Sequence, residues 1–171
     1  MASPQPSGAM AVVDRMYKCF AQGDMATLKS DVFHPQIVWN MPGHHPLAGA
    51  KCGPDEVIQF FSALLKSGVT VDNVSFGTIG DDRVVETHYG HGETEGEKYD
   101  FPTCTVYRMQ DGKLKDVQVY TAVQHDVDRF FFKTQPMDAL SHGGDSDAQK
   151  IAAELKDLVS LLSKWHPSGQ A

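Results

Sequence analysis

Acid–base chemistry could be carried by a short stretch that contains both a carboxylate and an imidazole. Glu86 and His88 are two residues apart, so their side chains would share one face of an extended strand. Imidazole titrates near neutral pH, which makes His88 the first candidate for a general acid or base. The alternative is a structural histidine that is hydrogen-bonded to a neighbour such as Glu86.

Asp100 is a second candidate for the base. Pro102 follows it in the same predicted strand, and a proline there favours an edge or a bulge that would turn Asp100 into a pocket. Asn40 and Tyr107 are the residues that we expect to polarise a carbonyl oxygen. Asn40 could equally satisfy the backbone of the loop that follows it.

Metal-dependent and nucleophilic chemistry find little support in the spacing of the reactive residues. His44 and His45 are adjacent in a loop rich in proline and glycine, where they could border the mouth of a pocket or lie in solvent. His88 and His91 are three apart and would point to opposite faces of a strand. The sequence contains no HExxH, GxSxG or CxxC motif. We therefore expect no metal site.

Composition restricts the classes of partner. The 171 residues carry a formal charge of −7 and 41% hydrophobic content, which suits one domain with a substantial core. No run of Lys and Arg is present, so nucleic acid and anionic membrane surfaces are not expected as partners. No apolar stretch is long enough to span a bilayer, and residues 1–8 do not resemble a secretory signal. The expected location is the cytoplasm.

Apolar spacing and turn residues predict the elements that would position these side chains. Helical spacing covers residues 9–22 and 25–30, and Pro54 begins a third helix that ends at Gly68. A short strand is expected between the second and third helices, and four more after them, at residues 36–40, 69–79, 83–91, 99–109 and 113–123. Helices followed by a meander indicate an α+β fold, with the helices packed on one face of an antiparallel sheet.

The remaining residues divide into terminal segments. Residues 1–8 are expected to be a disordered leader, 9–132 the domain, 133–145 a linker and 166–171 a tail. Residues 146–165 read as an amphipathic helix whose apolar stripe includes Ile151, Leu155, Leu158, Leu162 and Trp165. Isolated helices of this length are marginal in water, so this helix is expected to pack on its own domain or on a second subunit.

The order of these elements resembles the SnoaL-like branch of the nuclear-transport-factor-two-like superfamily, with ketosteroid isomerases and limonene epoxide hydrolases as distant cousins. The residues that carry the resemblance are Ile37–Gly43, Leu47–Gly49, Gly53–Phe61 and Asp111–Leu114, within residues 9–132. The resemblance implies a cone-shaped, curved sheet with N-terminal helices on its concave face and a pocket between them. It also implies a homodimer through the outer sheet face, and isomerase or cyclase activity without a cofactor, or binding alone.

The catalytic residues of those cousins do not carry over. The Asp base of ketosteroid isomerases aligns with Asn40, their Tyr with Met16 (Tyr17 is one place off), and their second Asp with Thr105. In the epoxide hydrolases, the Asn aligns with Asn40, whereas the Arg aligns with His88, and the two Asp positions with Gly90 and Val119. The chemistry of this chain must therefore depend on other groups.

Strand alternation and the resemblance together predict the pocket. Besides the catalytic candidates His88, Asp100, Asn40 and Tyr107, its lining is expected to include Met16, Phe20, Val38, Trp39, His44, His45, Glu86, Thr103, Thr105 and Val119. The expected function is an isomerase or cyclase that acts by acid–base chemistry on a small, apolar, carbonyl-bearing metabolite. The alternatives are a non-catalytic binding module for such a molecule, or an interaction protein that uses the helix at 146–165.

Overall fold

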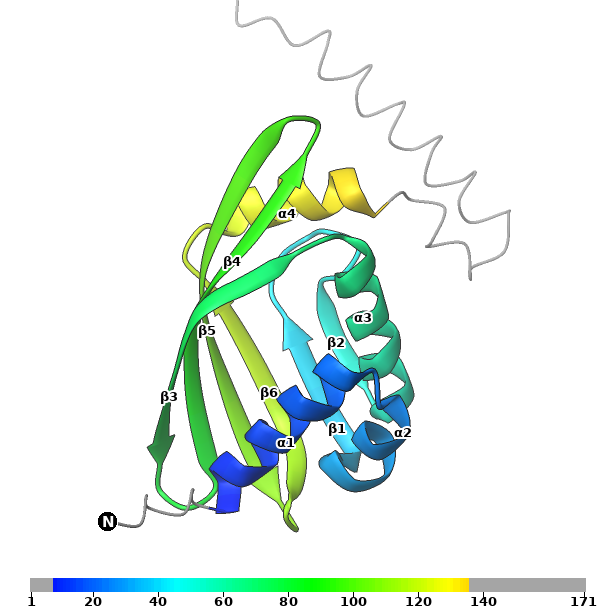
Figure 1. Cartoon of the computed structure of the whole chain (residues 1–171), viewed down its shortest axis with the longest axis vertical. Coiled ribbons are helices and arrows are strands. Elements are labelled where there is room, and N and C mark those ends of the chain that lie inside the picture. The colour runs from blue at the N-terminus through cyan, green and yellow to red at the C-terminus, as the bar shows by residue number, and fades with distance from the viewer. Residues whose placement is uncertain (1–7, 136–171) are drawn as a thin grey trace, which may run out of the picture. The chain divides into compact units, whose positions relative to one another are not determined.

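A computed structural model describes residues 8–135 and shows an α+β fold (Figure 1). Residues 1–7 of the predicted leader, residues 136–145 of the predicted linker, the helix at 146–165 and the tail lie outside the described residues. Gly8 begins α1, and the first two residues of the predicted linker, Lys133 and Thr134, belong to α4. The elements in chain order are α1 (Gly8–Gln22), α2 (Met25–Thr27), η1 (Leu28–Val32), β1 (Phe33–Met41), β2 (Gly49–Cys52), α3 (Pro54–Lys66), β3 (Thr70–Ile79), β4 (Arg83–Thr94), β5 (Glu97–Gln110), β6 (Lys113–Thr121) and α4 (Gln124–Thr134).

The helices begin and end where the local chemistry predicts. Gly23, at a φ of 70°, follows α1, and the Asp24 carboxylate then accepts a hydrogen bond from the backbone N–H of Thr27 at 3.0 Å. Pro54 stands at the start of α3, and Asp55 and Glu56 complement the positive end of its dipole. The two long N-terminal helices, α1 and α3, are thereby confirmed.

The sheet is mixed rather than wholly antiparallel. Its six strands lie in the order β2-β1-β6-β5-β4-β3. Strands β3 to β6 form the predicted antiparallel meander, but β1 runs parallel to β6, with Trp39 opposite Val117. The reason is topological: tight turns force successive strands to reverse, whereas the long connection from β1 through α3 to β6 allows a parallel pair. Strand β2, which was not predicted from the sequence, pairs with β1 at the sheet edge.

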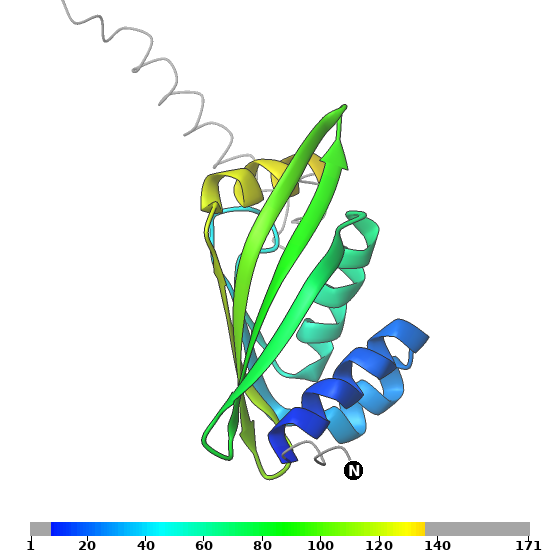
Figure 2. The ribbon, with the colours of Figure 1, turned by 60° about the vertical axis from the view of Figure 1, so that its left-hand side comes forward.

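The helices lie on one side of the curved sheet. Figure 2 shows α1 and α3 over the concave face, while α4 lies across one end, beside the β4–β5 hairpin. The hairpin turn is tighter than expected: Glu95 and Gly96, at φ values of 54° and 77°, connect β4 directly to β5. Positive φ at both central residues matches the twist of the flanking strands. The longer hairpin extends the sheet to the position where α4 packs.

Helix α4 was not predicted from the sequence, and it is held by close packing and by ion pairs. The Phe130 ring is fully buried against β4 at Gly92, where an added Cβ would stand 2.5 Å from a ring carbon. Glu97 of β5 accepts hydrogen bonds from Arg129 at 2.5 Å and Lys133 at 3.0 Å. Gly92 therefore lets α4 approach β4 more closely than any larger residue would allow.

Replacing Gly92 should loosen this end of the domain. We expect Gly92→Ala to lower the free energy of unfolding by about 1–3 kcal/mol, because the new methyl group overlaps the Phe130 ring. Gly77→Ala is the matched control in β3, since no atom lies within 4 Å of its added Cβ, and it should change stability by no more than about 0.5 kcal/mol. Urea denaturation compares the two; equal effects would contradict the packing described for α4.

Candidate active site

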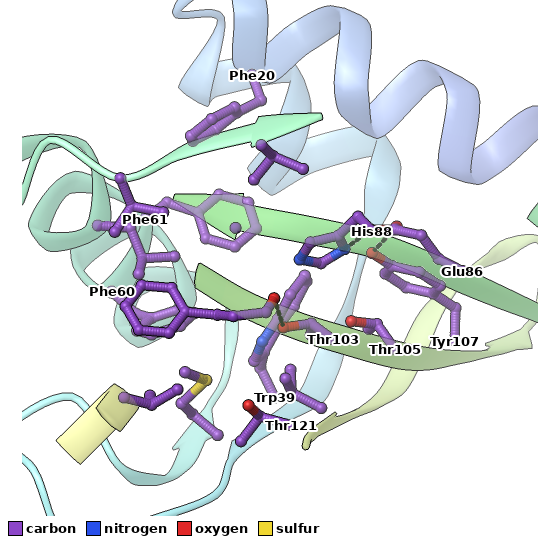
Figure 3. A pocket seen from close by; sticks show the side chains of 18 of the residues that line it. Phe20, Trp39, Phe60, Phe61, Glu86, His88, Thr103, Thr105, Tyr107 and Thr121 are labelled. Atoms are coloured by element: carbon purple, nitrogen blue, oxygen red, sulfur yellow. Dashed lines mark hydrogen bonds and ion pairs between the residues drawn. The ribbon is translucent and has the colours of Figure 1, made fainter. Parts of the chain in front are cut away.

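A cavity of about 190 Å³ lies between the helices and the concave face of the sheet. Its walls are mostly apolar and aromatic, and Figure 3 shows Phe20, Phe60, Phe61 and Trp39 around it. The full lining is Met16, Tyr17, Phe20, Trp39, Met41, Phe60, Phe61, Leu64, Val69, Val71, Glu86, His88, Gly90, Phe101, Thr103, Thr105, Tyr107, Val119, Thr121, Val127 and Phe131. An apolar cavity with a few polar groups is typical of a small-molecule site.

A carboxylate is buried in the wall of this cavity. Glu86 on β4 is 0% exposed. One of its oxygens lies 2.5 Å from His88 Nδ1, and the other accepts a hydrogen bond from the Tyr107 hydroxyl at 2.5 Å. The Tyr17 hydroxyl of α1 also acts on this carboxylate and lowers its pKa. Burial alone would raise the pKa of Glu86, but hydrogen bonds from His88, Tyr107 and Tyr17 outweigh it, and the pKa lies below its ordinary value.

The ionised carboxylate fixes the protonation of the histidine beside it. A carboxylate can only accept hydrogen bonds, so His88 must donate through Nδ1–H. In the neutral ring, Nε2 then carries the lone pair. Figure 3 shows this second nitrogen on the side of the ring away from Glu86, facing the cavity. The pair thus presents a base to whatever occupies the apolar space.

The two tyrosines support the carboxylate as neutral donors. Burial, followed by the negative charge of Glu86, raises the pKa of Tyr17 well above its ordinary value. Burial is also the main cause of the strongly raised pKa of Tyr107. Both hydroxyls therefore stay protonated and are engaged with Glu86, so neither is placed to donate to a ligand.

The sheet also contributes polar groups to the cavity. The Thr103 hydroxyl donates to the Phe101 carbonyl at 2.9 Å. Thr105 is 2% exposed, and no residue in the described part of the chain is hydrogen-bonded to its hydroxyl. Trp39 Nε1 is likewise buried without a hydrogen-bond partner among residues 8–135. The cavity therefore contains both satisfied and unsatisfied polar groups.

Most of the expected lining residues do face this cavity, from α1 and four strands. They are Met16, Phe20, Trp39, Glu86, His88, Thr103, Thr105, Tyr107 and Val119. Thr121, which strand alternation also predicts to face inward, lines the cavity as well. Sequence reasoning missed several others, namely Tyr17, Phe60, Phe61, Met41, Val127 and Phe131. The apolar stripe of α3 indicated Phe60 and Phe61 as buried but not that they face a cavity, and Val127 and Phe131 belong to the unpredicted α4.

Asn40 and Val38 lie on the opposite face of the sheet, so their expected place in the pocket is wrong. They line a hollow on the outer face with Val106, Arg108 and Gln118. The physical reason is the alternation of β1, in which the larger apolar side chains of Ile37 and Trp39 take the inward positions. Asn40 and His88 therefore cannot contact the same molecule inside the cavity.

Asp100 is also outside the cavity. Its side chain is 75% exposed and accepts a hydrogen bond from His91 at 2.7 Å. The expected bulge at Pro102 does not form, because Pro102 stays in register opposite Tyr89. Regular alternation therefore gives the inward position to Phe101, and Asp100 faces outward.

The two loop histidines have different surroundings, and neither lines the cavity. The His44 side chain is 90% exposed. The His45 ring is buried and stacks on Phe131 at 4.8 Å between ring centroids. Its Nε2 lies 3.1 Å from the Pro42 carbonyl, and its Nδ1 accepts from the Leu47 N–H at 3.2 Å. His45 thus holds the loop against α4 as a neutral ring.

Two further findings concern metals and membranes. Among residues 8–135, no three His, Cys, Asp or Glu side chains come together in a way that could hold a metal ion. None of the described helices has the length and apolar character needed to cross a bilayer.

Comparison with known proteins identifies the family. The SnoaL-like domain family matches residues 13–117, and the chain belongs to it. The fold is similar to that of Bal32a from a soil-derived mobile gene cassette, with 25% identity, a TM-score of 0.62 and coverage of 72% of this chain and 96% of that one. No curated protein sequence matches this chain.

Two other solved structures share the fold. An NTF2-like protein from Burkholderia xenovorans LB400 has 17% identity and a TM-score of 0.66, over 74% of this chain and 98% of that one. TerC, co-crystallised with polyporic acid, has 21% identity and a TM-score of 0.57, over 68% of this chain and 93% of that one. These similarities extend the assignment to the NTF2-like fold.

Removing one donor from Glu86 should destabilise the domain. We expect Tyr107→Phe to lower the free energy of unfolding by about 1–3 kcal/mol, because a buried carboxylate loses a hydrogen bond. Tyr120→Phe is the control, since the Tyr120 side chain is 55% exposed on the outer face. Chemical denaturation of both variants checks this; a Tyr107→Phe protein as stable as Tyr120→Phe would show that Glu86 does not need the bond.

His45 and His91 should give pH effects of opposite sign. Burial lowers the pKa of His45 against the opposing charge of Asp128, so its contribution to stability is lost as the pH falls below about 6.5. Hydrogen bonds to Asp72 and Asp100 raise the pKa of His91, so its contribution is present below about 6.5 and is lost as the pH rises through the raised value. NMR titration should find His91 titrating at higher pH than His45. The reverse order would contradict the surroundings described for the two rings.

Proposed function

We propose that this SnoaL-like protein is a cofactor-independent acid–base enzyme acting on a small, neutral, carbonyl-bearing molecule. The observation that carries the proposal is the His88–Glu86 pair, in which the buried carboxylate holds the imidazole 2.5 Å away inside an apolar cavity. His88 is the base, and Glu86 positions it. Asp100 and Asn40 have no part in the reaction, because both lie outside the cavity.

The reaction begins with transfer of a proton from carbon. His88 Nε2 takes a proton from the carbon beside the carbonyl, and the C–H electron pair moves into the enolate. The resulting imidazolium keeps its Nδ1–H bond to the Glu86 carboxylate, whose negative charge stabilises it. Returning the proton to a different carbon completes an isomerisation. In a cyclisation, the enolate carbon instead attacks a second carbonyl of the same molecule, and the proton goes to the new alkoxide.

The lining of the cavity supports a neutral and largely apolar substrate. Within residues 8–135, no Lys or Arg side chain lines the cavity, so a carboxylate or phosphate would find no positive partner there. A cavity of about 150 Å³ can hold a benzene molecule, and this one of about 190 Å³ suits one or two rings. Aromatic walls such as Phe60, Phe61 and Trp39 favour flat apolar ligands.

A non-catalytic binding protein is the second candidate. It is favoured by one observation: the residues expected to polarise the carbonyl, Asn40 and Tyr107, are respectively outside the cavity and engaged with Glu86. In that case His88 would only hydrogen-bond the ligand. Proton exchange on a bound ketone distinguishes the two functions, because binding alone does not break a C–H bond.

The test uses 2-tetralone, a neutral two-ring ketone, as the probe. The full-length protein in D₂O should accelerate exchange of the protons beside the carbonyl, followed by ¹H NMR. His88→Gln keeps a donor for Glu86 but removes the base, so the acceleration should fall by about 100-fold or more. His44→Gln changes an exposed histidine and should behave as wild type. The proposed enzymatic activity would be contradicted if bound 2-tetralone exchanged its protons no faster than free 2-tetralone. It would also be contradicted if the His88→Gln variant kept full activity.

A further inference from the structure

We infer that the Thr105 hydroxyl is the group that receives the carbonyl oxygen of the ligand, and that the ligand is therefore a neutral ketone or aldehyde rather than an acid. This inference rests on the proposed function, because it supplies the hydrogen-bond donor that the reaction needs opposite the base. The residues expected to polarise the oxygen are not available for it. A donor within the cavity must take that role if an enolate is to form there.

The hydrogen bonds of the cavity leave few donors for a ligand. Tyr17 and Tyr107 are engaged with Glu86, His88 Nδ1 with the same carboxylate, and the Thr103 hydroxyl with the Phe101 carbonyl. Trp39 Nε1 has no partner among the described residues, but less than 1 Å² of the atom is accessible. Two hydroxyls remain as donors on the cavity wall, those of Thr105 and Thr121, and the Thr121 oxygen already accepts from the Val123 N–H at 3.5 Å. Thr105 is the one beside the base, because it lies on β5 next to β4, whereas Thr121 lies one strand farther away on β6.

Burial makes the unpaired state of Thr105 informative. Polar groups that are withdrawn from water nearly always have a hydrogen-bond partner, because an unsatisfied group destabilises the fold. Thr105 is 2% exposed, and nothing in residues 8–135 bonds to its hydroxyl. The oxygen is not one of the fully enclosed unpaired atoms of the described residues, so it is open to the cavity that Thr105 lines. Valine has almost the same shape and would fit the strand without this cost. A hydrogen bond to a ligand would explain why this position has a hydroxyl that does not stabilise the free protein.

The register of the sheet places Thr105 correctly relative to the base. Thr105 on β5 lies opposite Glu86 on β4, and Thr103 lies opposite His88. Thr105 and His88 are thus diagonal neighbours on one face, about 7–8 Å apart along the sheet. Figure 3 shows both side chains on the cavity side. A carbonyl oxygen bonded to Thr105 can therefore have its neighbouring carbon beside His88.

The charges around the cavity select the kind of oxygen. Glu86 is an anion in the wall, and its three hydrogen-bonding partners satisfy it within the protein. A second anion would be repelled, and in the described part of the chain no lining Lys or Arg would offset that repulsion. A neutral carbonyl oxygen accepts from Thr105 without adding charge until the enolate forms. Carboxylic acids, which are ionised at neutral pH, are excluded.

The experiment compares 2-tetralone with tetralin, the same ring system without the oxygen. Thr105→Val should weaken binding of 2-tetralone about 3- to 10-fold by calorimetry, corresponding to one neutral hydrogen bond, and leave tetralin unchanged. The C=O stretch of bound, ¹³C-labelled 2-tetralone should move to higher frequency in Thr105→Val. Thr105→Ser should restore both the wild-type affinity for 2-tetralone and the wild-type C=O frequency. Thr87→Val, the same change on the outer face opposite Cys104, should leave both as in wild type.

Stability separates a ligand-binding role from a structural one. Because its hydroxyl has no partner within residues 8–135, Thr105→Val should melt at the same temperature as wild type or higher. A lower melting temperature together with equal loss of 2-tetralone and tetralin binding would overturn the inference. So would unchanged 2-tetralone affinity and C=O frequency in Thr105→Val, or failure of the wild-type protein to bind 2-tetralone.

Failure of the inference can be distinguished from failure of the proposed function. If the hydroxyl-dependent binding and frequency shift are found without proton exchange, Thr105 receives the oxygen in a binding protein and the enzyme is contradicted. If His88-dependent exchange is found and Thr105→Val leaves binding, frequency and exchange rate unchanged, the enzyme stands and the role of Thr105 is refuted.

Discussion

The buried carboxylate of Glu86 is the constraint on which the candidate site depends. A carboxylate withdrawn from water must be hydrogen-bonded or it will take up a proton. Hydrogen bonds from two strands meet this need, from His88 of β4 and Tyr107 of β5, and the Tyr17 hydroxyl of α1 helps to keep the pKa of Glu86 low. The two bonds connect β4 to β5 and fix the orientation of the imidazole. Stability and chemistry are thus served by one group, and apolar side chains of α3 and α4 form the other walls of its cavity.

Much of this arrangement could be predicted because it follows from local spacing. The separation of two residues between Glu86 and His88 places both on one face of any extended strand, and the tight turn at Asp111 and Gly112 fixes the β5–β6 pair. The caps and apolar stripes of α1 and α3 likewise follow from short stretches of sequence. Such features need no knowledge of distant residues.

The errors come from choices that only tertiary packing decides. Asn40 and Trp39 are adjacent, and the short strand pattern does not determine which of them faces inward until α3 brings Phe60 and Phe61 against Trp39. Pro102 could have caused a bulge, but pairing along the full lengths of β4 and β5 keeps the register. Helix α4 was missed because its apolar side chains, Val127, Phe130 and Phe131, occupy only part of a polar stretch. The role of Tyr17 could not be predicted from local spacing, because the residue it acts on, Glu86, is 69 positions away in the sequence.

The tautomer of His88 tests the central claim most directly. A neutral histidine in water prefers the proton on Nε2, whereas an ionised Glu86 requires it on Nδ1. Long-range ¹H–¹⁵N correlation spectra of the full-length protein distinguish the two nitrogens, and His88→Gln assigns the signal. The account predicts that, in the neutral ring, Nδ1 carries the proton and Nε2 is bare. A proton on Nε2 would leave no base facing the cavity and would contradict it.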